Sequence, residues 1–168
     1  MKAAISSEVQ AHPEVAMLEL LKKIHLFENL SENELEKILK ICVKQSFAKD
    51  AVIFKEGEPG DRCYIITTGA VRISKYIPNI GEEALAVLKP GDYFGEMALI
   101  DSFPRSANAI TNDDVDVFAI NKTEFDRVLI SDRELGYKLL WTFTQTLSKR
   151  LRETNEKLAS FLAMSGGF

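Results

Sequence analysis

Residues 94–109 read Phe-Gly-Glu-Met-Ala-Leu-Ile-Asp-Ser-Phe-Pro-Arg-Ser-Ala-Asn-Ala, and the interpretation of the whole chain starts from this segment. Gly95 has no side chain and therefore allows the backbone to approach a ligand closely. Glu96 to Asp101 are expected to form a short helix, whose first amides point outward at its positive end and favour an anion. Arg105 follows nine positions after Glu96. Its planar, permanently charged donor group suits phosphate oxygens.

Glu96 decides which anion would fit, because a carboxylate beside a phosphate repels it unless the same ligand also offers a hydrogen-bond donor. A ribose whose phosphate is closed into a ring meets both needs, with its 2′-hydroxyl for Glu96 and its phosphate for Arg105. Ser106 adds a hydroxyl, and Ala107 leaves its amide accessible. A simpler reading of each residue stays open. Glu96 would then only stabilise its own helix, and Arg105 would be a surface arginine paired with Asp101 or Glu96, a contact of about 0 to 1 kcal/mol.

Around this segment, from about Ser46 to Ile120, turn residues separate short runs rich in Val, Ile, Tyr and Phe. In two of these runs apolar and polar residues alternate, as at Val71 to Ser74 and Val115 to Val117, which is typical of strands. Many short strands divided by turns predict a β-sandwich or a jelly-roll β-barrel, and we assign it to residues 45–121.

Helices are predicted on both sides of the barrel, in residues 1–44 and 122–164. The stretch Pro13–Leu26 has near-helical apolar spacing, and Ser31 to Glu34 form a capping box that begins a second helix. The apolar face of this second helix is expected to contain Leu35, Ile38, Leu39 and Cys42. The fold class is therefore mainly β with flanking α, in a single domain.

The last predicted helix runs from about Arg133 to Met164, with no proline and one glycine, and would be about 45 Å long. A stripe along it would protrude unless a partner helix covered it. Its members are Leu140, Phe143, Leu147, Leu151, Thr154, Leu158 and Phe161. We expect a homodimer through this helix, while packing of its first half against the barrel remains an alternative.

Composition excludes several classes of protein. The chain has 168 residues, of which 46% are hydrophobic and 27% charged, as in ordinary globular domains. Its longest apolar run, Ala84 to Leu88, is five residues, whereas a membrane span needs about 20. The N-terminus lacks the apolar centre of a secretory signal, so we expect a cytoplasmic protein without membrane association. Two histidines, His12 and His25, and two separated cysteines do not suggest a metal site, and no cofactor is expected.

The charge distribution argues against nucleic acid as a partner. The net charge is −4, and residues 45–121 hold seven basic against twelve acidic side chains. Nucleic-acid affinity rests on many phosphate contacts from a basic surface. An anion bound by this acidic segment must therefore be held locally, by an arginine and backbone amides.

Residues 94–109 resemble the phosphate-binding cassette of the cyclic nucleotide-binding domain. This family includes catabolite activator proteins, regulatory subunits of cyclic-nucleotide-dependent kinases and cyclic-nucleotide-gated channels. Residues 56–61, leading into 64–71, are similar to the upstream hairpin of the same family, as is the helix entry at residues 30–32. The resemblance covers roughly residues 20–160, and it implies a cyclic nucleotide-binding jelly-roll barrel with N-terminal helices and a long C-terminal helix.

The resemblance also implies roles for individual residues. Arg105 would pair with the cyclic phosphate, and Glu96 would accept the ribose 2′-hydroxyl. Backbone amides of Gly95, Met97 and Ala98 would line the pocket, and Ser106 and Ala107 would reach the phosphate. Residues 149–157 are similar to the stretch by which the catabolite activator family caps the adenine, so Thr154 is a candidate base contact. Asn155 stands where that family has a serine.

The function we expect is a non-catalytic cyclic-nucleotide sensor that signals through its flanking helices to an effector protein of unknown identity. The expected ligand is cAMP, because of Thr154, with cGMP or a cyclic dinucleotide as alternatives. A transcription regulator would need a DNA-binding segment after the long helix, which only a longer chain would provide. A scaffold that has lost its ligand is the third alternative, although the charged pair of residues 96 and 105 is intact.

Overall fold

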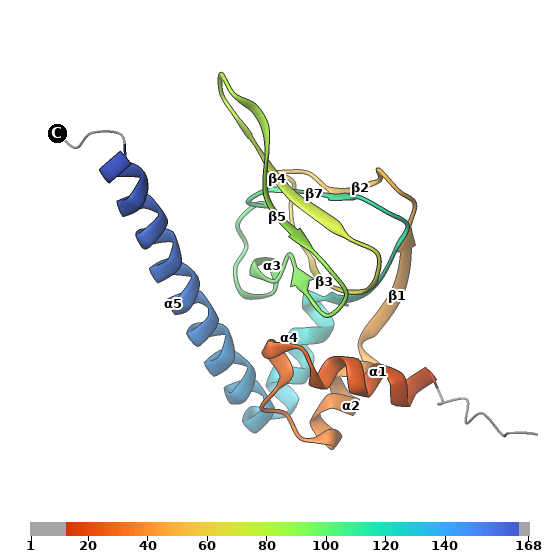
Figure 1. Cartoon of the computed structure of the whole chain (residues 1–168). Helices are drawn as coiled ribbons and strands as arrows, with labels where there is room; N and C mark the ends of the chain where they lie inside the picture. The colour runs from red at the N-terminus through yellow and green to blue at the C-terminus, as the bar shows by residue number, and fades with distance from the viewer. Residues whose placement is uncertain (1–12, 165–168) are drawn as a thin grey trace, which may run out of the picture.

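The structure is a computed structural model that describes residues 13–164; residues 1–12 and 165–168 lie outside the description, and with them His12 and the N-terminal segment considered above. Two four-stranded antiparallel sheets form the barrel (Figure 1). One has the order β1-β8-β3-β6 and the other the order β2-β7-β4-β5. The strands are β1 (Cys42–Phe47), β2 (Val52–Phe54), β3 (Arg62–Thr68), β4 (Val71–Ile77), β5 (Gly81–Leu88), β6 (Tyr93–Phe94), β7 (Asn108–Thr111) and β8 (Val115–Asn121). The predicted jelly-roll class of fold is confirmed.

The interior of the barrel is filled by side chains that alternate along the strands. Val115 and Val117 of β8 are buried, whereas Asp116 between them reaches the surface, as the sequence pattern predicted. The rings of Tyr64 and Phe94 stack at 5.1 Å between centroids. This aromatic packing holds β6, the strand that leads directly into residues 95–109, against β3.

The helices gather at one end of the barrel, except for the short α3 and the second half of α5 (Figure 1). They are α1 (Pro13–Lys22), the 3-10 helix η1 (His25–Phe27), α2 (Glu32–Lys40), α3 (Met97–Ile100), α4 (Lys122–Ser131) and α5 (Arg133–Met164). A second core joins these helices to the barrel, and its fully buried members include Leu21, Leu35, Ile38, Phe125 and Leu139. None of the helices between residues 13 and 164 has an apolar stretch of the length and hydropathy that a bilayer-spanning segment requires.

Three boundaries differ from the prediction. The first helix ends at Lys22, and Leu26 lies in the separate 3-10 turn η1. The second helix ends at Lys40, so Cys42 is not on its apolar face but is the first residue of β1. The barrel therefore begins at residue 42 and not at residue 45. Cys42 pairs with Ile120 of β8, a tertiary contact that helical periodicity alone does not reveal.

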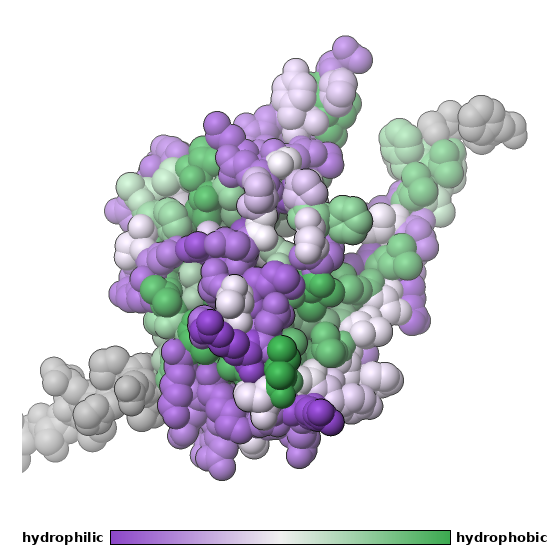
Figure 2. All heavy atoms as spheres, turned by 180° about the vertical axis from the view of Figure 1, so that it is seen from behind, coloured by the Kyte–Doolittle hydropathy of each residue, from purple (hydrophilic) through white to green (hydrophobic). Residues whose placement is uncertain are grey.

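The predicted extent of α5 agrees with the structure, but its apolar stripe is divided between two environments. Phe143 is 3% exposed and packs edge-on against Phe125, so its place in a protruding stripe was wrong. It belongs with Leu135 and Leu139, which lie at spacings of four on the inner face. Residues 151–164 are all exposed and project away from the barrel, with apolar side chains visible on them in Figure 2.

Candidate functional site

Residues 94–107 surround a cavity of about 330 Å³, which is the size of a small-molecule site. The cavity lies between this segment, the base of the β4–β5 hairpin and α5. Seven of the eight predicted site residues line it, namely Gly95, Glu96, Met97, Ala98, Arg105, Ser106 and Ala107. The chain thus brings together residues that the sequence analysis grouped by their chemistry and by the family resemblance.

Arg105 is buried in the wall of this cavity, at 7% exposure. One terminal nitrogen donates to the Gly95 carbonyl at 3.1 Å, and the other donates to the Arg62 carbonyl at 2.9 Å. The guanidinium also lies 4.1 Å above the centre of the Phe54 ring. Its Nε is buried and has no hydrogen-bond partner among residues 13–164. Within that range no carboxylate forms an ion pair with Arg105, so the simpler reading as a paired surface arginine does not hold.

The electrostatic state of Arg105 follows from this environment. Burial lowers the pKa of the Arg105 guanidinium, because the charged form loses its hydration. An arginine nevertheless keeps its proton at neutral pH. The cavity wall therefore contains the positive charge of Arg105, which no carboxylate pairs with among residues 13–164. Its Nε–H is a donor without a partner in the same range. This combination favours an anionic ligand.

Two glycines make room for Arg105. Gly95 has a φ of +72°, and a Cβ there would lie 2.6 Å from the Arg105 Nη1. At Gly60 a Cβ would lie 2.8 Å from the Ala98 Cβ and 3.0 Å from the Arg105 Nε. Cβ contacts of 2.6 and 2.8 Å essentially never occur, so a side chain at either glycine would force Arg105 or Ala98 to move. Gly60 was part of the sequence resemblance, but its contact with Arg105 was not predicted.

The segment before β3 fixes the backbone on either side of the guanidinium. The Arg105 amide donates to the Glu58 carbonyl at 2.8 Å, and the Arg105 carbonyl accepts from the Gly57 amide at 2.9 Å. The Asn108 side chain accepts from the Glu56 amide at 2.9 Å. The sequence similarity at residues 56–61 thus corresponds to a structural role, because this loop pairs with the loop that presents Arg105.

Glu96 is also buried, at 6% exposure, and its Oε1 accepts a short hydrogen bond from Arg150 of α5. No partner of the second carboxylate oxygen, Oε2, is found among residues 13–164. Arg150 therefore balances the carboxylate charge next to the anion site and leaves an acceptor available. Sequence reasoning missed Arg150. The available clue was that a buried carboxylate needs a cation, and that Arg150 lies within the stretch 149–157.

Helix α3 offers fewer unpaired backbone amides to a ligand than predicted. The Ala98 amide donates to the Gly95 carbonyl at 3.2 Å, and the Leu99 amide donates to the Glu96 carbonyl at 3.0 Å. Only the amides before Ala98 remain outside the bonds within this turn. Ala98 and Ala107 are buried, whereas Met97 is 44% exposed.

Thr154 is the predicted site residue that the structure does not bring to the cavity. It is exposed, and its hydroxyl donates to the Arg150 carbonyl at 2.8 Å within α5. The contribution of α5 to the cavity lining is Arg150, one helical turn earlier. The predicted helix therefore reaches the cavity through Arg150, and the role of Thr154 as a base contact stays a prediction.

The remaining walls are apolar. Ile73 of β4 and Ala86 and Leu88 of β5 line the cavity, and Phe54 and Phe103 add aromatic rings. A shift in strand register between Ile73 and Ser74 marks a bulge in this hairpin. Charged groups together with a flat apolar wall suit a ligand that has an anionic part and a planar apolar part.

Comparison with known proteins agrees with this geometry. A family model described as the cyclic nucleotide-binding domain matches residues 44–132. A CRP-like cAMP-activated global transcriptional regulator of Mycobacterium tuberculosis is 33% identical over 147 residues, which are 87% of this chain and 63% of the regulator. A cAMP-dependent protein kinase regulatory subunit of Hypocrea atroviridis is 36% identical over 109 residues, which are 65% of this chain and 22% of that subunit.

Solved structures show the same relationship. A cyclic nucleotide-binding domain from Methylobacillus flagellatus superposes with a TM-score of 0.74 at 31% identity, covering 86% of this chain and 81% of that one. The Thermus thermophilus catabolite activator protein gives a TM-score of 0.74 at 28% identity, covering 82% of this chain and 62% of that protein. The chain thus spans less than two thirds of the curated relatives described here. From its family match over more than half its length, its fold and its cavity, the chain belongs to the cyclic nucleotide-binding domain family.

Proposed function

We propose that this domain is a cAMP sensor, in which Arg105 receives the cyclic phosphate and Glu96 the ribose 2′-hydroxyl. One observation supports this proposal above all: Arg105 is buried, has no acidic partner among the described residues, and keeps an unused Nε donor in the wall of a cavity of suitable size. A permanently charged group left in this state is costly to the free protein and is compensated when an anion binds.

The other parts of the ligand match the remaining walls. The free oxygen of Glu96 accepts a hydroxyl, and the wall of Ile73, Ala86 and Leu88 packs against the base. This wall has no side-chain hydrogen-bond donor or acceptor, so it adds contact area and does not read the edge of the base. The preference for cAMP is therefore our proposal from the two named relatives, which are described as cAMP-activated and cAMP-dependent.

The output of the domain is a change in α5. Since Arg150 contacts Glu96, a ligand that hydrogen-bonds Glu96 alters the contact that holds α5 beside the cavity. We assign no catalytic step, cofactor or metal to the site, and we place the protein in the cytoplasm with an effector protein as its partner. We propose no nucleic-acid contact by this chain, given its net charge of −4. Tight, salt-sensitive binding to promoter DNA in a gel shift would contradict this last point.

A second copy of the chain is the proposed partner of the exposed face of α5. Leu140, Leu147, Leu151, Leu158 and Phe161 are between 41% and 67% exposed and recur at spacings of three, four or seven, as in a coiled-coil seam. Light scattering should give twice the mass of the chain, and replacing both Leu151 and Leu158 with glutamate should give the monomer. A wild-type monomer at high concentration would rule out this dimer.

Calorimetric titration with cAMP, cGMP and cyclic di-GMP tests the central proposal. We expect cAMP to bind most tightly and Arg105→Met to weaken binding at least about 30-fold. Arg72→Met, which removes an arginine of β4 paired with Glu82 outside the cavity lining, is the matched control and should bind like the wild type. Tighter binding of cGMP or of the dinucleotide would correct the ligand, and absence of binding to all three would leave the scaffold interpretation.

A further inference from the structure

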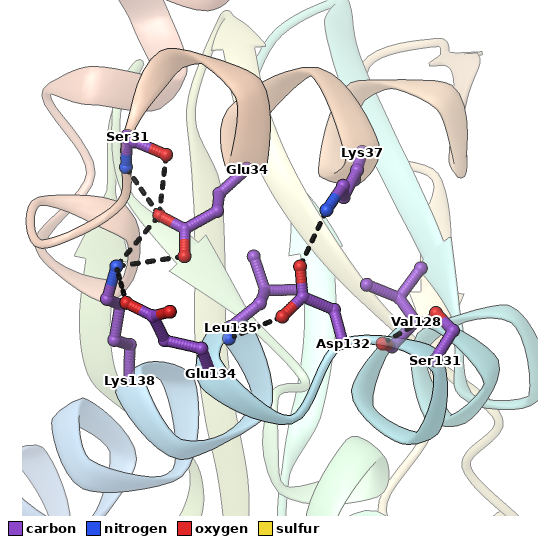
Figure 3. A network of polar contacts seen from close by, with 9 residues as sticks. All are labelled: Ser31, Glu34, Lys37, Val128, Ser131, Asp132, Glu134, Leu135 and Lys138. Atoms are coloured by element: carbon purple, nitrogen blue, oxygen red, sulfur yellow. Dashed lines mark hydrogen bonds and ion pairs between the residues drawn. The ribbon is translucent and has the colours of Figure 1, made fainter.

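Two ion pairs join the start of α5 to α2 (Figure 3). The Lys138 ammonium lies 2.9 and 3.1 Å from the two carboxylate oxygens of Glu34, although these residues are 104 positions apart. The Lys37 ammonium lies 2.6 Å from Asp132, the residue that precedes α5. Neither pair belongs to the cavity lining. Their position is of interest because α5 also carries Arg150.

The Glu34–Lys138 pair differs from an ordinary surface pair because the carboxylate is already fixed. The Glu34 side chain is 9% exposed and accepts from the Ser31 amide at 2.7 Å and from the Ser31 hydroxyl at 2.8 Å. Burial alone would raise the pKa of Glu34, but the hydrogen bonds from Lys138 and Ser31 lower it, which shows a charge held in place. Because the carboxylate is already fixed, forming the pair costs only the side-chain entropy of the lysine and not that of both partners.

Asp132 is fixed in a similar way on the other side. Its carboxylate accepts from the Leu135 amide at 3.1 Å in the first turn of α5, as well as from Lys37. The hinge between α4 and α5 and the second turn of α5 are therefore both attached to one helix, α2. Figure 3 shows that the two attachments lie side by side on facing helices.

Helix α5 connects this attachment to the ligand site. It is continuous from residue 133 to residue 164, and Arg150 follows Lys138 by 12 residues, or about 18 Å along the axis. Between them, the buried residues Leu139, Thr142 and Phe143 pack the helix onto the base of the domain. Beyond Phe143 two polar contacts link α5 to residues that line the cavity: Arg150 pairs with Glu96, and the Thr146 side chain hydrogen-bonds with Tyr93. A small rotation of α5 about its base would be largest at its far end and would separate Arg150 from Glu96.

We propose that Glu34 and Lys138 are positioning residues of the nucleotide site: by fixing the direction in which α5 leaves the helical base, they hold Arg150 against Glu96. This inference rests on the proposed function, because it assigns a distant ion pair to the affinity of the same cavity. Without the pair, Arg150 spends less time at Glu96, and the uncompensated carboxylate opposes the incoming phosphate.

A double-mutant cycle tests this mechanism through cAMP affinity. In the wild-type background, Lys138→Met should weaken binding about threefold to tenfold, whereas in the Arg150→Met background it should change binding less than about twofold. Lys138→Arg keeps the charge and should restore most of the affinity. Lys22→Met serves as the matched control. It removes a lysine of α1 that pairs with Glu32 of α2, and it should leave affinity unchanged. Equal losses in both backgrounds, or failure of Lys138→Arg to restore binding, would overturn the proposal.

A ligand-free measurement separates this inference from the proposed function. Spin labels at two exposed positions, Asp113→Cys on the barrel and Glu156→Cys on α5, report the distribution of distances between them. Lys138→Met should broaden this distribution, and Lys22→Met should not. Failure of cAMP, cGMP and cyclic di-GMP to bind the wild type would show that the proposed function is wrong. An unchanged distance distribution in Lys138→Met would refute the positioning role, whether or not a nucleotide binds. Circular dichroism of each variant establishes that it is folded.

Discussion

Arg105→Met separates what the buried arginine does for the ligand from what it does for the fold. The substitution keeps an unbranched chain of similar length in contact with Phe54, and it removes the charge and all the donors. The two lost hydrogen bonds, to the Gly95 and Arg62 carbonyls, involve a charged donor and contribute about 1.5 to 3 kcal/mol each. Opposing them is the cost of keeping a guanidinium out of water, which is several kcal/mol.

Because these contributions are of similar size and opposite sign, the free energy of unfolding without ligand should change by less than about 2 kcal/mol. Ligand affinity has no such compensation. Loss of a charged phosphate partner costs about 2 to 5 kcal/mol, which weakens binding roughly 30-fold to several thousand-fold. The variant should therefore be folded and nearly as stable as the wild type, and yet respond to the nucleotide only at much higher concentration.

Thermal unfolding with and without cAMP measures both quantities in one experiment. At 100 times the wild-type dissociation constant, ligand should add about 2.7 kcal/mol to the wild type, or roughly 5 to 11 °C in Tm. For a variant that binds at least 30-fold more weakly, the same concentration adds about 0.9 kcal/mol or less. A variant that keeps the full ligand shift would refute the assignment of Arg105 to the phosphate. A loss of unfolding free energy far above about 2 kcal/mol would instead show that Arg105 is mainly structural.

Three further measurements follow from the geometry. Gly60→Ala should weaken cAMP binding about tenfold or more in calorimetry while changing Tm only modestly, since its new Cβ displaces Arg105, and unchanged affinity would contradict this packing. The pKa of Glu34 is lowered from its ordinary 4.5, so its contribution to stability is complete above that pH and is lost as the pH falls through the folded-state value. The free energy of unfolding measured with urea should therefore fall as the pH is lowered below about 4.5, and this fall should be less steep for Glu34→Gln than for the wild type. Burial raises the pKa of partly buried Cys42 to about 12 and raises that of fully buried Cys63 further. An aromatic disulfide reagent should therefore react slowly with Cys42 and with Cys63 only after unfolding, and rapid reaction of both thiols in the folded protein would contradict these environments.

The sequence predicts well those features that depend on residues close together in the chain. The capping box at Ser31 and Glu34 is present, because its geometry depends on a spacing of three within one helix. Residues 94–107 surround a cavity, because glycine, proline and arginine at fixed intervals determine a local path for the backbone. The extent of α5 was readable from the absence of proline and the single glycine between Arg133 and Met164.

The features that sequence missed depend on pairs far apart in the chain. The Arg150–Glu96 contact spans 54 positions and requires knowledge of how α5 lies beside the barrel. Phe143 was placed on the wrong side of α5 because spacings of three and four fit two adjacent stripes, and only the position of Phe125 on α4 distinguishes them. Thr154 and Arg150 are one turn apart on the same face of α5. Helical periodicity therefore does not show that the cavity lining includes Arg150 and not Thr154.

An apparent conflict in the sequence, an anion site inside an acidic segment, is resolved by the pairing of the neighbouring carboxylates. Glu96 is paired with Arg150, and Asp61 accepts two hydrogen bonds from Arg62 at 2.8 and 2.7 Å. These carboxylates are thereby balanced by cations other than Arg105, and the Arg62 guanidinium holds the pKa of Asp61 below its ordinary value. Of the charged side chains that line the cavity, Asp101 and Arg105 form no ion pair within residues 13–164. Asp101 is only partly buried and accepts from the Phe103 amide, whereas Arg105 is buried and its partners are carbonyl oxygens and an aromatic ring. Net charge over a segment is therefore a poor guide to what it binds, since a phosphate responds to the nearest unbalanced charge within a few ångströms.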